Sequence, residues 1–199
     1  MRNDVEIRSL REAPNYNEET REVSGYAIVW DVESRIMWDG EEFVEVIARG
    51  AIAEDDLKRY DVKALFNHGR DYLLARSVNG QGTLNLIIDE VGLRFSFVTP
   101  NTTWGNDVLE LIKRGDLRGC SFAFTVNNGD VEYSRKKDGL CLRTIKRIAE
   151  LHDVSVVVDP AYLQTTVSAR SWEATPAFVD TASHEERKKY IKSILNNNL

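Results

Sequence analysis

Three polar residues in separate parts of the chain have the side chains that acyl transfer at a peptide bond requires. Ser121 lies where a predicted helix and a glycine-containing turn lead into the strand-forming run Cys120 to Val126. His68 ends one apolar run, and Asp153 opens another. Acyl transfer needs a nucleophile, a base that takes its proton and a group that orients the base. A serine alone is a weak indicator, because most serines at such boundaries only satisfy a turn.

The segments that carry these residues belong to a chain of many short predicted strands. Apolar residues at helical spacing predict a helix that ends before Gly115 and leads into the Ser121 strand. Repeated short strands with one or two helices predict an α+β domain, with an antiparallel, barrel-like β core and a few flanking helices. The other predicted elements are strands at 5–10, 23–30, 43–47, 62–68, 73–78, 83–88, 93–98, 131–134, 140–148 and 153–158, a helix at 51–59 and a loop at 14–19.

The alternation of side chains along a strand separates neighbours in two of these segments. It sends Asp153 to one face and His152 to the other, so only one of them can contact His68. In the same way, only one of Cys120 and Ser121 can face His68.

The composition is that of a soluble globular protein and limits the classes of partner. The 199 residues are 42% hydrophobic and 29% charged, with a net charge of −6, so there is no basic excess for nucleic acid. Cys120 and Cys141 lack metal-ligand spacing, which favours free thiols in a reducing cytoplasm. The first residues lack the apolar core of a signal peptide, and no run reaches the roughly 18 apolar residues that span a membrane.

Taken in chain order, the segments around His68, Ser121 and Asp153 resemble the tailed-phage prohead proteases. These enzymes mature procapsids and are similar to the herpesvirus assembly proteases. The resemblance extends from about Gly25 to Arg170. Its motifs are FVEVIARGAI, ALFNHG, GTLNLIIDEVGLRF, LIKRGDLRGCSFAF and DVSVVVDPAY.

This resemblance implies roles for the polar residues. Ser121, the serine of SFAF, is the expected nucleophile and His68 the expected base. Asp153 matches the acid of the prohead family, whereas herpesvirus relatives use a histidine in that role, so His152 and Glu150 remain alternatives. The assignment predicts a distance of about 2.6–3.2 Å between the Ser121 hydroxyl and a His68 ring nitrogen.

Two further expectations concern the surroundings of the nucleophile. Cys120 is a rival nucleophile, although the family motif favours its serine neighbour and a small core residue is the simpler interpretation of Cys120. The related proteases form an oxyanion hole from a loop that corresponds to residues 159–162 here. Pro160 has no N–H, so the backbone N–H groups of Ala161 and Tyr162 are the candidate donors.

The resemblance implies a serine endopeptidase without cofactor or metal, packaged inside the procapsid in the host cytoplasm. Its expected substrates are scaffold or the scaffold-like extension of the major capsid protein, and the chain itself, bound by strand addition. A homo-oligomer is possible, and neither nucleic acid nor membrane is an expected partner. The alternatives are a non-catalytic capsid-assembly protein that binds scaffold and a hydrolase built on Cys120.

The expected organisation is a protease domain at 1–170 and an extension at 171–199. The extension has no clear period until residues 183–186, which look like a capping box that opens a final helix to Leu195.

Overall fold

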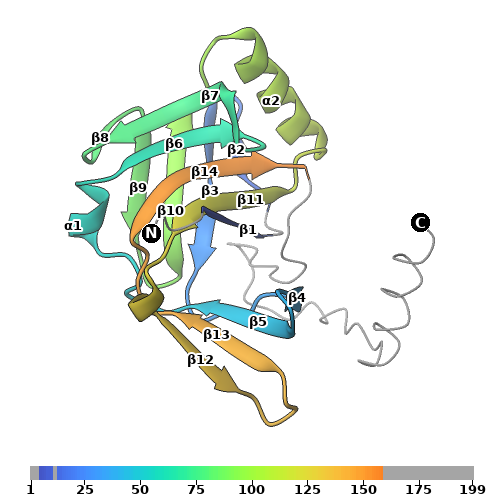
Figure 1. Ribbon diagram of the computed structural model, residues 1–199. Coiled ribbons are helices and arrows are strands. Elements are labelled where there is room, and N and C mark those ends of the chain that lie inside the picture. Colours follow the sequence, from blue (N-terminus) through green and yellow to red (C-terminus); the bar gives the residue numbers. More distant parts are fainter. Residues whose placement is uncertain (1–4, 11–12, 159–199) are drawn as a thin grey trace. The chain divides into compact units, whose positions relative to one another are not determined.

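The computed structural model describes residues 5–10 and 13–158, which form three β-sheets and two α-helices (Figure 1). The α+β class predicted from the sequence is therefore confirmed. The strands are β1 (Glu6–Leu10), β2 (Asn15–Asn17), β3 (Glu22–Val29), β4 (Met37–Trp38), β5 (Glu42–Ile47), β6 (Asp61–Phe66), β7 (Gly69–Val78), β8 (Gln81–Gly82), β9 (Leu84–Ile88), β10 (Gly92–Val98), β11 (Gly119–Thr125), β12 (Val131–Arg135), β13 (Cys141–Ile145) and β14 (Glu150–Val157). The helices are α1 (Glu54–Leu57) and α2 (Thr103–Arg114), with a 3₁₀ turn at Asn128–Asp130.

A six-stranded sheet carries all three candidate residues. Its strand order is β1-β11-β14-β6-β7-β8, so strands distant in the sequence become neighbours. The β11 and β14 strands are antiparallel, whereas β14 and β6 are parallel. Strand β1 forms one edge, paired antiparallel with β11 (Figure 1). This order brings the segments around Ser121, Asp153 and His68 together.

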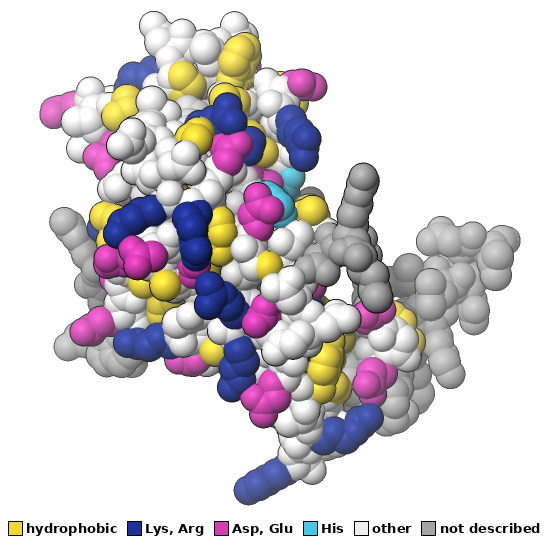
Figure 2. Space-filling view, turned by 60° about the vertical axis from the view of Figure 1, so that its left-hand side comes forward, with side chains coloured by type: hydrophobic (Ala, Val, Ile, Leu, Met, Phe, Trp, Pro, Cys, Tyr) yellow, Lys and Arg dark blue, Asp and Glu magenta, His cyan; other side chains and the backbone are white. Residues whose placement is uncertain are grey.

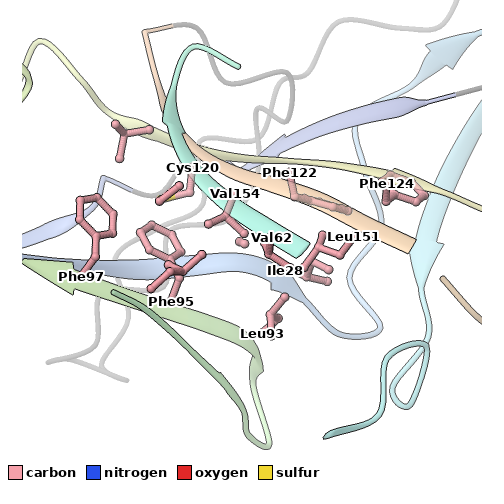
Figure 3. Close-up of a cluster of buried hydrophobic side chains, with 14 of the residues drawn as sticks. Ile28, Val62, Leu93, Phe95, Phe97, Cys120, Phe122, Phe124, Leu151 and Val154 are labelled. Atoms are coloured by element: carbon pink, nitrogen blue, oxygen red, sulfur yellow. The ribbon is translucent and has the colours of Figure 1, made fainter. Parts of the chain in front are cut away.

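A four-stranded antiparallel sheet, β2-β3-β10-β9, packs against the inner face of the six-stranded sheet. Their facing side chains form a core of large apolar residues (Figure 3). Phe122 and Phe124 of β11 and Val154 of β14 point into this core, together with Phe95 of β10. Because side chains alternate along a strand, the residues between them leave the sheet on the opposite face.

The third sheet, β12-β13-β5-β4, combines antiparallel pairs with a parallel pair between β13 and β5. It contains two buried charged residues, Glu45 on β5 and Arg143 on β13. These two side chains contact Arg8 and Glu6 of strand β1 in the six-stranded sheet.

Helix α2 leads directly into the strand that carries Ser121. Thr102 caps its first turn by accepting a hydrogen bond from the Gly105 amide at 3.2 Å. Gly115 ends the helix in a left-handed conformation, with φ of 76°, which glycine adopts without strain. The indole of Trp104 donates to the Leu73 carbonyl at 3.0 Å and ties the helix to β7. The chain is thereby directed into β11.

Several expected elements are corrected by the structure. The expected loop at 14–19 contains the short strand β2, which pairs with β3. The expected helix at 51–59 is a single turn, and the expected strand at 140–148 is limited to β13. The core is not purely antiparallel, since two strand pairs are parallel, and no closed barrel is formed among the described strands. The expected boundary at 170 and the helix after residue 183 lie outside the described residues.

The surface carries charges of both signs. On the face in Figure 2, Lys and Arg side chains lie among Asp and Glu side chains, so this face offers no continuous basic surface. Among the described helices, none has the length and apolar character needed to cross a membrane.

Candidate active site

His68 lies in the tight turn that joins β6 to β7, because the strand that was expected to end at His68 ends at Phe66. Asn67 and His68 both have positive φ angles, of 48° and 57°, which is the pattern of a two-residue hairpin turn. Such angles are uncommon outside glycine, and non-glycine examples often mark functional positions. Asn67 ties the turn to β14, because its amide donates to Val156 and its side-chain oxygen accepts from the Val158 amide, at 3.0 and 3.1 Å.

Ser121 lies in the middle of the sheet's pairing scheme rather than at a strand end. It pairs directly with Ser155 of β14 on one side and with Ser9 of β1 on the other. The three serines therefore form a row across three adjacent strands, with their side chains on one face. Ser121 is fully buried.

The side chains of Ser121, His68 and Asp153 are joined by two short contacts. His68 Nε2 lies 2.6 Å from Ser121 Oγ, and His68 Nδ1 lies 2.7 Å from Asp153 Oδ1. The predicted proximity of Ser121 and His68 is therefore confirmed. An ionised carboxylate only accepts hydrogen bonds, so Nδ1 carries a proton. In the neutral ring Nε2 is then the acceptor, and it is directed at the Ser121 hydroxyl.

Ser155 makes a third contact at this site. Its hydroxyl donates to Asp153 Oδ1 at 2.8 Å and lies 3.3 Å from His68 Nδ1. Since Nδ1 already carries a proton, the Ser155 proton is directed at the carboxylate. Ser155 is two residues from Asp153, so strand alternation puts both side chains on one face, but no motif in the sequence indicates a role for Ser155.

Strand β1 also contacts the nucleophile candidate. The Ser9 hydroxyl donates to Ser121 Oγ at 2.7 Å, and the Ser121 hydroxyl lies in donating position to the Arg8 carbonyl at 2.8 Å. No local sequence pattern indicated these contacts, because Ser9 and Ser121 are 112 positions apart.

Cys120, the rival nucleophile, faces the core. Cys120 is fully buried, and its side chain lies in the core near Phe95 (Figure 3). A Cβ built on Gly25 of β3 would lie 3.0 Å from Cys120 Sγ, so the thiol packs against the facing sheet. It therefore points away from the face that carries Ser121.

The alternative third residues do not approach His68. His152 lies where the pairing of β14 with β11 is irregular, and its Nδ1 lies 3.8 Å from Glu150 Oε1. The buried His152 Nε2 has no hydrogen-bond partner among the described residues. The expected oxyanion donors, Ala161 and Tyr162, lie outside the described residues.

Strand β1 is held in place by a cluster of four charged residues. Arg8 donates to Glu45 from two nitrogens, at 2.7 and 2.9 Å, and Arg143 donates to Glu6 from two nitrogens, at 2.6 and 2.7 Å. Arg8 also contacts Glu6, and Arg143 also contacts Glu45. Glu6 and Arg8 belong to β1, so the cluster links this strand to β5 and β13.

The charged cluster shifts the pKa values of its members. Burial alone would raise the pKa of Glu6, but hydrogen bonds and charges from Arg143 and Arg8 hold it below its ordinary value of 4.5. Burial alone would lower the pKa of Arg143, but its contacts with Glu6 and Glu45 raise it above the ordinary value. Both groups are therefore charged near neutral pH.

No metal site accompanies the contacts at Ser121. Within residues 5–10 and 13–158, no group of three or more His, Cys, Asp or Glu side chains is placed to hold an ion. The chemistry that this arrangement of side chains can perform is proton transfer from a hydroxyl to an imidazole held by a carboxylate.

A serine hydroxyl, an imidazole and a carboxylate in series are the arrangement of a serine hydrolase. The profile of the caudovirus prohead serine protease family matches residues 4–178 of the chain. The chain therefore belongs to this family of phage capsid-maturation serine peptidases. Comparison with curated proteins and with solved structures gives no match.

Proposed function

We propose that this chain is a serine endopeptidase in which Ser121 is the nucleophile, His68 the base and Asp153 the residue that orients the base. The observation that carries the proposal is the continuous series of contacts from Ser121 Oγ through the His68 ring to Asp153 Oδ1, at 2.6 and 2.7 Å. Membership of the prohead serine protease family supports it independently.

In the first step, Ser121 Oγ attacks the carbonyl carbon of the scissile peptide bond while its proton passes to His68 Nε2. A new C–O bond forms, and the carbonyl electrons move to the oxygen. The imidazolium then gives the proton to the leaving nitrogen as the C–N bond breaks. Water then attacks the acyl carbon and gives a proton to the same Nε2. The imidazolium returns this proton to Ser121 Oγ as the C–O bond to Ser121 breaks, which releases the acid and restores the hydroxyl.

Asp153 and Ser155 act on the imidazole rather than on the substrate. The Asp153 carboxylate keeps the proton on Nδ1 and stabilises the charge that His68 gains. The Ser155 hydroxyl holds that carboxylate through Oδ1. The oxyanion donors are expected from the backbone of Ala161 and Tyr162.

The proposed substrates are scaffold or the scaffold-like extension of the major capsid protein, together with the chain itself. We place this activity inside the procapsid in the host cytoplasm, with the major capsid protein as partner. The order of the motifs also supports a core related to that of the herpesvirus assembly proteases.

The competing proposals fit the contacts less well. A non-catalytic binding protein has no use for a buried serine, histidine and aspartate in series. A hydrolase built on Cys120 would need that thiol on the outer face, whereas it packs in the core.

Selective labelling tests the proposal. The wild-type protein and Cys120→Ala are expected to react with a fluorophosphonate at Ser121, whereas Ser121→Ala and His68→Ala are not. Peptide mapping identifies the labelled residue. Labelling with iodoacetamide at Cys120 that abolishes proteolysis, with no fluorophosphonate adduct at Ser121, would contradict the assignment.

A further inference from the structure

Strand β1 lies along the edge of the strand that carries Ser121. The two strands are antiparallel, and five residue pairs, from Glu6 with Phe124 to Leu10 with Cys120, align them (Figure 1). The backbone of β1 therefore occupies the edge of β11 along most of its length. An extended polypeptide that is to pair with this edge of β11 needs the same backbone groups.

The contacts of β1 also fill the space around the nucleophile. Ser121 Oγ has one bonded carbon, Cβ, and three polar neighbours within 2.8 Å: His68 Nε2, Ser9 Oγ and the Arg8 carbonyl oxygen. Cβ and these three neighbours occupy all four directions around a tetrahedral oxygen, and Ser121 is fully buried. Attack requires a carbonyl carbon within about 3–3.5 Å of Oγ. His68 must remain as the base, so the groups that have to leave are those of β1.

The Arg8 carbonyl has a second effect on the hydroxyl. Ser121 has one proton, and two acceptors lie within hydrogen-bonding distance of its oxygen: His68 Nε2 and the Arg8 oxygen. When the proton is directed at Arg8, it is not available to the base. The contact with β1 therefore competes with activation of the nucleophile.

We infer that β1 occupies the substrate-binding edge and that the arrangement described here is a latent form of the protease. The ligand for this edge is an extended polypeptide segment, which forms an antiparallel ladder with β11 in place of β1. The exchange replaces one set of backbone hydrogen bonds by another, so substrate and β1 compete for the same groups. This inference rests on the proposed function, because it concerns access to Ser121.

The charged cluster sets how firmly β1 is held. Arg8 is joined to Glu45 by a pair of hydrogen bonds, and Glu6 is joined to Arg143 by another pair. Glu45 and Arg143 belong to another sheet. Paired, charge-assisted hydrogen bonds of this kind are strong and directional. Departure of β1 must break them, and weakening them favours the open form.

A disulfide between β1 and β11 tests the inference. Leu10 pairs directly with Cys120, and both side chains are buried on the face opposite to Ser121, so Leu10→Cys allows a bond to the native Cys120 that does not touch the site. The rate of Ser121 labelling by a fluorophosphonate is measured with the variant oxidised and reduced. We expect oxidation to slow labelling roughly 100-fold, the scale of a disulfide's effect on an opening equilibrium, and reduction to restore it. Leu10→Cys combined with Cys120→Ala cannot form the bond and should label equally under both conditions.

A second variant keeps the test independent of the disulfide. Glu6→Gln removes the charge that holds Arg143, and we expect it to speed labelling roughly tenfold, as expected when hydrogen bonds to a charged group are weakened. Asp61→Asn is the matched control, because Asp61 of β6 accepts two hydrogen bonds from Arg76 of β7 at 2.7 Å, and these strands are separated from β1 by β11 and β14. It should label at the wild-type rate.

The outcomes separate this inference from the proposed function. Equal labelling rates for oxidised and reduced Leu10→Cys, with the disulfide verified by mass, would overturn the role of β1 while Ser121 remains an activated nucleophile. Unchanged labelling of Glu6→Gln would overturn the role of the charged cluster. If no form is labelled at Ser121, including Glu6→Gln, the proposed function fails and the inference with it.

Discussion

His68 contacts two serines that lie directly opposite each other on β11 and β14, and it uses a different ring nitrogen for each. Nε2 lies 2.6 Å from Ser121 Oγ, and Nδ1 lies 3.3 Å from Ser155 Oγ. The direct pairing of the two serines places both hydroxyls on the same face of the sheet. Asp153, two residues before Ser155, reaches the Nδ1 side of the ring from this same face.

We predict that Ser155→Ala lowers kcat while KM changes little. The Ser155 hydroxyl contacts Asp153 and the imidazole, and loss of a hydrogen bond to a charged group corresponds to roughly 10–100-fold in rate. Ser96→Ala, on β10 of the sheet β2-β3-β10-β9, is the control for removal of a strand serine. The Nδ1 proton resonance of His68 should shift in Ser155→Ala and not in the control. A normal kcat with an unshifted resonance would show that Ser155 does not position the imidazole.

The three candidate third residues are distinguished by conservative substitutions. Asp153→Asn should fold and cleave roughly 10⁴-fold more slowly, because the amide no longer fixes the tautomer or stabilises the imidazolium. Glu150→Gln and His152→Gln should lose much less, since neither side chain contacts His68. Turnover at matched enzyme concentration decides the question. A dead His152→Gln beside a near-normal Asp153→Asn would reverse the assignment.

The position of Cys120 in the core predicts a coupling with Gly25. A Cβ on Gly25 would lie 3.0 Å from Cys120 Sγ and 3.3 Å from Phe95, so Gly25→Ala should lower the free energy of unfolding by about 1–3 kcal/mol. Adding Cys120→Ala removes the sulfur and should recover part of this loss. Denaturant unfolding of the two single variants and the double variant measures the coupling. Strict additivity would show that the thiol points elsewhere.

The lowered pKa of Glu6 makes the attachment of β1 dependent on pH. A carboxylate whose pKa is depressed on folding stabilises the protein fully above its ordinary value, here 4.5, and this contribution is lost as pH falls through the lowered folded value. Wild-type stability should therefore decline below pH 4.5 more steeply than that of Glu6→Gln. At neutral pH Glu6→Gln should be less stable by about 1–3 kcal/mol.

Amide hydrogen exchange measured on both sides of pH 4.5 follows this change locally. Protection of the amides in Glu6–Leu10 should fall in acid earlier than protection of the core strands. Parallel pH profiles for wild type and Glu6→Gln would contradict the assignment to Glu6.

The parts of the site that the sequence predicted depend on local geometry. The two-residue period of a strand is enough to place Asp153 and Ser155 on one face and to separate Cys120 from Ser121. The end of α2 was also predictable, because Gly115 supplies the left-handed residue that follows the last turn.

The parts that it did not predict depend on pairing between distant segments. The contact of Ser9 with Ser121 arises only when β1 pairs with β11, and nothing in Glu6–Leu10 specifies that partner. The charged cluster has the same origin, since Glu45 and Arg143 come from strands of another sheet. His68 was expected at a strand end and lies in a turn, because Asn67 accepts the left-handed conformation that a tight hairpin needs.

Co-expression with the major capsid protein of the same phage tests most directly whether Ser121 cleaves peptide bonds in capsid components. Intact-mass measurement of the capsid protein compares wild type, Cys120→Ala and Ser121→Ala. We predict a shortened capsid protein, or shortened scaffold, with wild type and Cys120→Ala, and full-length proteins with Ser121→Ala. Shortened products in the presence of folded Ser121→Ala would contradict this prediction.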